Sequence, residues 1–131
     1  MVKVFNKYQG SEDSFQISVA RFLDNIPALK NKWTHIANEG KTDLRRNSKG
    51  QVYSLTGAKN KAKGKKKGLP DVMIFKRNAN FIGYAIELKV GYNKPSPEQN
   101  EWLKSLENEG WKTLVSYSLD EVIYEVEKYL K

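Results

Sequence analysis

The amino-acid sequence predicts a single α/β domain in which a mixed β-sheet is flanked by helices. Its 131 residues match the length of one domain and leave no room for a second independent core. The 15 aromatic residues supply enough apolar surface for a core, which excludes a fully disordered chain. Apolar spacing predicts elements in the order α-β-β-β-α-β-α, with a polar, basic insert after the first strand.

The first two elements are set by capping and spacing. Ser11 is a favourable N-cap, and apolar side chains then recur at helical spacing, so we predict a helix over residues 11–24. Pro27 ends this helix. A short apolar run over residues 33–36 predicts the first strand.

The next strands form a predicted hairpin. An apolar run over residues 71–75 and a longer one over residues 81–90 are separated by the turn-forming residues 78–80. Such a spacing favours two antiparallel strands joined by a short loop. The sequence therefore places Asp71, at the start of one strand, near the end of the other.

The C-terminal part predicts helix, strand and helix. Ser96, with Gln99 three residues later, has the pattern of a capping box, and Gly110 is suited to end that helix. A strand follows over residues 113–117. Ser118 then caps a final helix whose apolar residues lie on one stripe.

The insert over residues 41–67 carries most of the positive charge. The whole chain has a formal net charge of +8, yet residues 1–70 hold 15 Lys and Arg against 5 Asp and Glu. Residues 54–67 are compatible with a helix or with a loop, and no apolar periodicity decides between them. A polyanion such as DNA is the natural partner, although a solvated lysine run or an anionic-membrane patch has the same composition. The lysines concerned are Lys59, Lys61, Lys63, Lys65, Lys66 and Lys67.

Composition also excludes several classes of protein. The chain has no cysteine, which excludes disulfides, thiolate catalysis and Cys-ligated zinc, and its one histidine argues against a multi-His zinc site. No apolar run approaches the roughly 20 residues of a membrane span, and the N-terminus has no signal-peptide pattern. We therefore expect a soluble intracellular protein that does not bind membranes.

Asp71, Glu87 and Lys89 are the residues most suggestive of chemistry. Side chains alternate along a strand, so Glu87 and Lys89 share one face while their apolar neighbours share the other. If the two strands pair as a hairpin, Asp71 comes within several ångströms of Glu87. The alternative is that Glu87 and Lys89 are solvent-facing residues and that Asp71 is an ordinary turn residue after Pro70.

Two convergent carboxylates form a hard-oxygen site suited to Mg²⁺ or Mn²⁺. The main-chain carbonyl of Leu88, between the two charged residues, is a plausible third protein ligand. Such a metal lowers the pKa of bound water and stabilises charge on a phosphodiester, and Lys89 could orient the water or stabilise that charge.

The spacing of these residues resembles a known family. Gly68-Leu69-Pro70-Asp71, then Glu87-Leu88-Lys89, then Ser96-Pro97-Glu98-Gln99 is similar to the PD-(D/E)xK nuclease superfamily, and within it to the VRR-NUC (virus-type replication-repair nuclease) family. His35 to Gly40 resembles that family's His-x-x-Asn-x-Gly segment, and Glu12 to Gln16 its Glu-x-x-x-Gln. The resemblance spans about residues 11–130 and implies a restriction-endonuclease-like fold.

The resemblance also implies roles for individual residues. Asp71 and Glu87 would bind the divalent metal, and Lys89 would be the catalytic lysine. Gln99 would orient Lys89 or a phosphate, or merely complete the capping box. Glu12 would be an accessory carboxylate, or merely complement the helix dipole. The remaining residues, near the site or at the DNA backbone, would be His35 and Asn38.

The function implied by the resemblance is Mg²⁺- or Mn²⁺-dependent cleavage of branched DNA. Compact members of the family act as homodimers on four-way (Holliday) junctions, in the cytoplasm of a bacterial or phage-infected cell, in DNA repair. Two alternatives stay open: a non-catalytic basic module that binds nucleic acid, and a restriction-type endonuclease of the same superfamily. The sequence departs from the family mainly in its insert, where the lysine run is unusually dense.

Overall fold

The sheet is built as the sequence predicts. A computed structural model of the chain describes residues 3–37 and 44–131. Four strands lie in the order β1-β4-β5-β6, of which β4 pairs antiparallel with both β1 and β5, whereas β5 and β6 are parallel. The mixed sheet and the predicted hairpin are therefore confirmed. The strands are β1 (Trp33–His35), β4 (Val72–Ile74), β5 (Tyr84–Leu88) and β6 (Lys112–Ser116).

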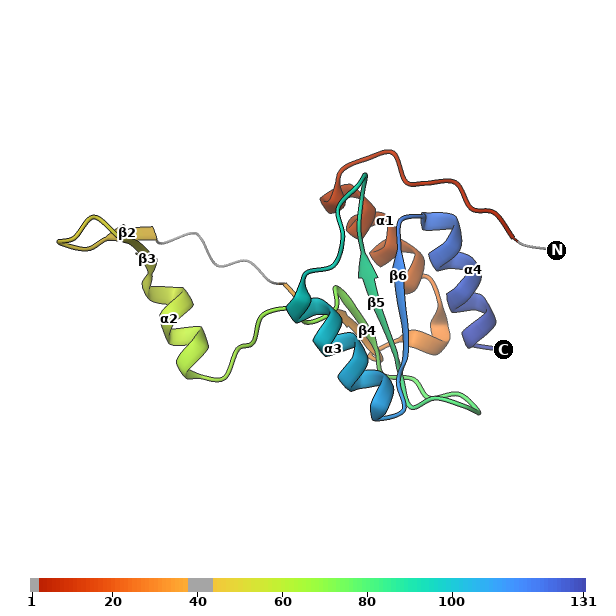
Figure 1. The fold of residues 1–131 in the computed structure, drawn as a ribbon. Coiled ribbons are helices and arrows are strands. Elements are labelled where there is room, and N and C mark those ends of the chain that lie inside the picture. The colour runs from red at the N-terminus through yellow and green to blue at the C-terminus, as the bar shows by residue number, and fades with distance from the viewer. Residues whose placement is uncertain (1–2, 38–43) are drawn as a thin grey trace.

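Helices cover both sides of this sheet (Figure 1). α1 (Glu12–Asp24) and α4 (Leu119–Tyr129) pack on one side, and α3 (Pro97–Asn108) lies on the other. α3 also makes the crossover that two neighbouring parallel strands require. A single 3₁₀ turn, η1 (Pro27–Leu29), follows α1 at the proline that was predicted to end it.

The three predicted serine caps begin the three helices of the body. The Oγ atoms of Ser11, Ser96 and Ser118 each accept a hydrogen bond from the backbone N–H three residues on, at 3.1–3.2 Å. Each bond satisfies one of the N–H groups that a helix start leaves unpaired. The helix boundaries were predictable for this local reason.

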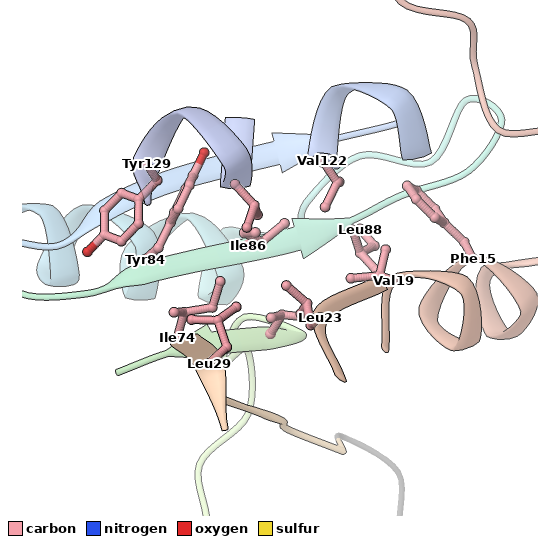
Figure 2. Close-up of a cluster of buried hydrophobic side chains, with 12 residues drawn as sticks. Phe15, Val19, Leu23, Leu29, Ile74, Tyr84, Ile86, Leu88, Val122 and Tyr129 are labelled. Carbon is pink, nitrogen blue, oxygen red and sulfur yellow. The ribbon is translucent and has the colours of Figure 1, made fainter. Parts of the chain in front are cut away.

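The core lies between the sheet, α1 and α4 (Figure 2). Alternate residues of β5, namely Tyr84, Ile86 and Leu88, are fully buried there, as the strand periodicity predicts for Ile86 and Leu88. Because side chains alternate, Ala85 and Glu87 face the other way, toward the side of α3. α1 contributes Phe15, Val19 and Leu23 to the core, and α4 contributes Val122, Val126 and Tyr129.

All four predicted strands of the sheet have different limits in the structure. The runs over residues 33–36 and 71–75 form strands only over Trp33–His35 and Val72–Ile74. The run over residues 81–90 forms a strand only from Tyr84 to Leu88, because these are the residues that the parallel partner β6 pairs, and Gly91 at φ +57° then turns the chain. Lys89 therefore follows the strand. The last strand ends at Ser116, one residue earlier than predicted.

Most of the insert forms an arm beside the body, which we define as residues 44–67 (Figure 1). It contains a hairpin of β2 (Leu44–Arg46) and β3 (Val52–Ser54), which the sequence analysis did not predict, and α2 (Leu55–Ala62). Residues 54–67 were compatible with a helix or with a loop. The structure contains both, since α2 ends at Ala62 and the residues after it are not helical. Within the described ranges, no helix is long and apolar enough to span a membrane.

Candidate active site

Glu87 is buried at the end of β5. Its side chain is only 1% exposed, so the alternative of a solvent-facing carboxylate is wrong. Val72 pairs with Ile86 in the antiparallel β4–β5 ladder, and one step further along the same register Asp71 lies opposite Glu87. The hairpin therefore brings the two acidic residues together, as the sequence analysis expected.

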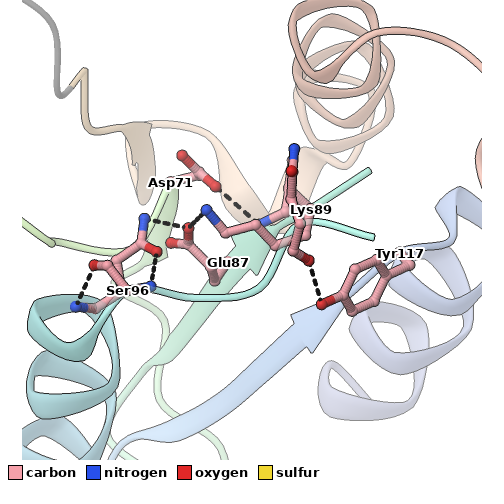
Figure 3. Close-up of polar contacts among 8 residues, drawn as sticks. Asp71, Glu87, Lys89, Ser96 and Tyr117 are labelled. Carbon is pink, nitrogen blue, oxygen red and sulfur yellow. Dashed lines mark hydrogen bonds and ion pairs between the residues drawn. The ribbon is translucent and has the colours of Figure 1, made fainter. Parts of the chain in front are cut away.

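Asp71 is held at both its side chain and its main chain. Its Oδ2 accepts a hydrogen bond from the backbone N–H of Leu88 at 2.8 Å (Figure 3). Its carbonyl oxygen accepts from the Ile36 N–H at 2.9 Å and from the ring of His35 at 2.8 Å. Because a carbonyl can only accept, Nδ1 of His35 carries the proton in this contact. His35 thus lies beside the site and contacts the backbone of Asp71.

One oxygen of Glu87 has two partners and the other has none among the described residues. Oε2 lies 3.2 Å from the Lys89 ammonium and accepts from Nε2 of Gln99 at 2.7 Å. Oε1 is buried without a hydrogen-bond partner in the described part of the chain. A buried carboxylate oxygen without a partner is costly, so Oε1 is the place where a positively charged group would be stabilising.

Gln99 completes the capping box and also contacts Glu87, whereas the resemblance implied that it orients Lys89 or a phosphate. Its Oε1 accepts from the backbone N–H of Ser96 at 2.8 Å and completes the capping box of α3. Its Nε2 donates to Glu87, as described above. The cap fixes one end of the amide and thereby aims the other end at the carboxylate, which makes Gln99 a link between the start of α3 and β5.

Gly68 explains how α3 comes so close to the strand that carries Asp71. Its φ is +86°, and a Cβ built on it would lie 2.8 Å from the carbonyl carbon of Glu98 and 3.0 Å from the backbone nitrogen of Gln99. Only glycine permits both the backbone conformation and this close approach. The glycine of the Gly-Leu-Pro-Asp segment therefore seats the first turn of α3 against the site.

Burial and mutual repulsion shift the acidic groups in the same direction. Burial, with further contributions from Asp71 and Glu12, raises the pKa of Glu87 to about 7, although Lys89 opposes the shift. Burial likewise raises the pKa of Asp71, against the hydrogen bond from Leu88 and the charge of Lys89. Three carboxyl groups therefore share one electrostatic environment in which full ionisation is unfavourable.

The residues present fit a divalent cation. Main-chain oxygen or water would complete its coordination shell. Two carboxylates converge, one has an unpartnered buried oxygen, and hard oxygens are what Mg²⁺ and Mn²⁺ prefer. Within residues 3–37 and 44–131, no three His, Asp or Glu side chains are close enough to form a complete ligand set. An ion at Asp71 and Glu87 thus needs a further ligand such as the Leu88 carbonyl.

The other residues predicted to belong to the site are Glu12, Asn38 and the six lysines of the insert. Glu12, at the start of α1, interacts electrostatically with Lys89 and Asp71, and burial is the main cause that raises its pKa. Asn38 lies outside the described residues. The six predicted DNA-binding lysines, from Lys59 to Lys67, are exposed on α2 and on the segment after it, which belong to the arm.

Sequence reasoning did not single out the loop between β5 and α3. There, the Tyr117 hydroxyl donates to the Asn93 carbonyl at 2.7 Å, and this bond ties the loop to the end of β6 (Figure 3). The contact joins residues 24 positions apart, and no local periodicity signals it. The only signal was the glycine-tyrosine-asparagine sequence of residues 91–93, which is typical of a turn.

Comparisons with known proteins agree with this geometry. A solved structure of a VRR-NUC domain protein matches with a TM-score of 0.73 and 24% identity, over 94% of this chain and 90% of that chain. No curated protein matches the chain. The family model of the VRR-NUC domain matches residues 16–119.

The fold and the family model define a class of protein, a nuclease of the PD-(D/E)xK superfamily. Within that class, the chain belongs to the VRR-NUC domain family. A nuclease domain implies that the chain binds DNA.

Proposed function

We propose that this chain is a divalent-metal-dependent DNA endonuclease that cuts four-way junctions as a homodimer. The observation that carries the proposal is the state of Glu87, which is buried, held on one oxygen by Lys89 and Gln99, and unpartnered on the other beside Asp71. A purely structural glutamate would have both oxygens paired or solvated. A site that binds DNA without cutting it needs no such arrangement.

Each residue of the cluster then has a distinct task. Asp71, Glu87 and the Leu88 carbonyl would hold Mg²⁺ or Mn²⁺, which when bound lowers the pKa of water and offsets charge on the phosphodiester. Lys89, fixed by its contact with Glu87, would hold the attacking water or the developing charge on the scissile phosphate. Gln99 keeps Glu87 in place, and Glu12 adds negative charge beside Lys89.

The positive charge of the arm supports DNA as the binding partner. Six exposed lysines between residues 59 and 67 suit the phosphates of DNA, which release condensed counterions when they are neutralised. A homodimer would place two equivalent sites on a two-fold junction, so that two strands could be cut. His35 and Asn38 are proposed to lie at the DNA backbone near the site.

The test uses a labelled four-way junction and a linear duplex of the same sequence, each with Mn²⁺ and the full-length chain. We expect cuts near the branch of the junction, no cuts in the linear duplex, and no cleavage by Glu87→Gln. Glu98→Gln, an exposed glutamate on α3, is the matched control and should cut like the wild type. Equal cleavage by wild type and Glu87→Gln would contradict the proposal.

Other outcomes separate the alternatives. Cleavage of the linear duplex at one sequence would indicate a restriction-type enzyme. Tight junction binding without any cleavage, together with no metal-binding heat that Asp71→Ala abolishes in calorimetry, would indicate a binding module. A molecular mass of one chain on the junction would contradict the homodimer.

A further inference from the structure

An aromatic ring projects into solvent three residues after Lys89. Tyr92 is 96% exposed, in the loop that extends beyond the end of β5 and returns to α3 (Figure 1). Three residues of chain span at most about 11 Å, so this loop starts at the candidate active site. A ring that is this exposed adds little to the core and is accessible to another molecule.

The loop that carries Tyr92 is fixed at several points. The Tyr117 hydroxyl binds the Asn93 carbonyl at 2.7 Å, and the Asn93 N–H donates to the Val90 carbonyl at 3.2 Å and closes a turn. Gly91 at φ +57° permits that turn. The ring is thus presented from a preorganised backbone, which lowers the entropy lost on binding.

A positive charge lies beside the exposed ring, and a second lysine follows in the same loop. The Lys7 ammonium lies 5.3 Å from the centroid of Tyr92 and 5.8 Å from that of Tyr117. Lys7 is held there because the backbone N–H of its neighbour Tyr8 donates to the Tyr117 carbonyl at 2.7 Å. Lys94 is exposed in the same loop, and the sequence from Lys89 to Pro97 contains no acidic residue.

An exposed ring among ammonium groups matches the chemistry of a nucleotide. The ring offers a face on which a base can stack, and the lysines offer charge for the adjoining phosphates. An apolar protein surface would instead bury these ammonium groups without partners, which is costly. In a continuous duplex every base is covered on both faces, so only a branch, gap or end offers a free face to Tyr92.

We infer that Tyr92 is a stacking platform for a base whose face is free at a branch next to the cleaved phosphodiester, and that it gives the enzyme its preference for branched over continuous DNA. The inference rests on the proposed function and adds a residue that selects the substrate. Stacking requires the aromatic ring of Tyr92 and does not require its hydroxyl. The test therefore compares a variant without the ring with a variant that lacks only the hydroxyl.

The experiment measures stacking without cleavage. A four-way junction and a matched duplex each carry 2-aminopurine, at the branch or at the centre, and are titrated with full-length Glu87→Gln chain without divalent metal. We expect quenching of the junction probe only. Adding Tyr92→Ala should abolish the quenching and weaken junction binding about tenfold, because stacking contributes about 1–3 kcal/mol per base and 1.4 kcal/mol is tenfold. Adding Tyr92→Phe should preserve both.

The matched control is Tyr124→Ala on α4. Tyr124 is also exposed and also has a lysine over its ring, with Lys3 Nζ at 4.3 Å from the centroid, and we expect no effect. Undiminished quenching with Tyr92→Ala would overturn the inference. So would equal loss of junction and duplex binding, or a change from dimer to monomer with quenching retained, which would identify a contact between chains. Since no cleavage is measured, these results stand apart from the test of the endonuclease.

Discussion

At the scale of single residues, the ionised form of Glu87 that the proposed function needs is the form that is less favourable for the stability of the fold. Its folded-state pKa is about 7 against an ordinary value of 4.5, so the fold favours the protonated form. A carboxyl group whose pKa is raised on folding stabilises the protein at low pH, and that contribution is lost as the pH rises from 4.5 through 7. At neutral pH, ionisation of Glu87 in the metal-free protein therefore lowers the free energy of unfolding.

We expect Glu87→Gln to stabilise the metal-free protein at pH 8. The shift of the pKa from 4.5 to about 7 corresponds to about 3 kcal/mol between pH 4 and pH 8, and glutamine has no charge to lose. Denaturant unfolding with a chelator should show the wild type losing stability over this range relative to Glu87→Gln. Glu98→Gln, at an exposed site, should follow the wild type, and identical pH profiles for all three would contradict the expectation.

The three central residues of the site were predictable from sequence because strand geometry is local. Alternation places Glu87 and Lys89 together, and the hairpin places Asp71 opposite Glu87. The family resemblance placed Gln99 near the site, but its contact with Glu87 was not predicted, since that contact depends on how closely α3 approaches β5. The unpartnered oxygen of Glu87 is a property of packing and has no signature in the sequence.

At the scale of elements, the position of α3 depends on Gly68. Gly68→Ala would place a methyl group 2.8 Å from α3, whereas Gly64→Ala meets nothing within 4 Å, although both glycines have positive φ. Both variants carry a backbone strain of about 1–3 kcal/mol, and only Gly68→Ala must also displace the first turn of α3. We expect Gly68→Ala to lose most cleavage activity and Gly64→Ala to keep it. Equal activity in the two would show that the close approach is unimportant.

The arm is a separate element with a separate expected effect. Replacing Lys65, Lys66 and Lys67 with Ala should flatten the slope of log K against log[salt] for DNA binding by about 2–3 units, since each phosphate contact contributes about 0.9. The matched control replaces three exposed lysines of the body and removes the same charge. An unchanged slope for the arm variant would show that this run does not contact phosphate. The control lysines are Lys104, Lys128 and Lys131.

The sequence predicted the elements of the body and missed the hairpin of the arm for one reason. Every element of the body has a cap or an apolar periodicity, because each buries one side against the core. The strands of the hairpin, β2 and β3, have only three residues each and lie in a polar part of the sequence. Three residues are too few for an alternation of apolar and polar side chains to be recognised.

At the scale of the whole molecule, we expect the bound metal to contribute to stability. A ligand that binds only the folded state at 100 times its Kd adds about 2.7 kcal/mol, which is on the order of 10 °C in Tm for a domain of this size. Saturating Mn²⁺ should raise the Tm of the wild type, and a chelator should reverse the rise. Asp71→Asn should show little shift, whereas an equal shift would place the ion elsewhere.

The pairing of distant strands was beyond the sequence. Within the four-stranded sheet, the β4–β5 hairpin is the pairing between strands that follow one another in the chain, and it was predicted. That β1 pairs with β4 across the insert, and that β6 lies parallel to β5, depends on closure of the whole core. The pairing of strands that are distant in the sequence depends on apolar surface that many elements bury together, and no single segment determines it.

The β1–β4 ladder has one further consequence. The chain leaves the sheet after Ile36 and returns at Asp71, and these two residues are joined by a hydrogen bond of 2.9 Å. Departure and return are therefore neighbours, and the free energy of closing such an excursion rises by only about 0.6 kcal/mol for each doubling of its length. We therefore expect that this segment can be lengthened, trimmed or exchanged without disturbing the candidate active site, so that members of the family can differ in what they recognise while the proposed chemistry stays the same.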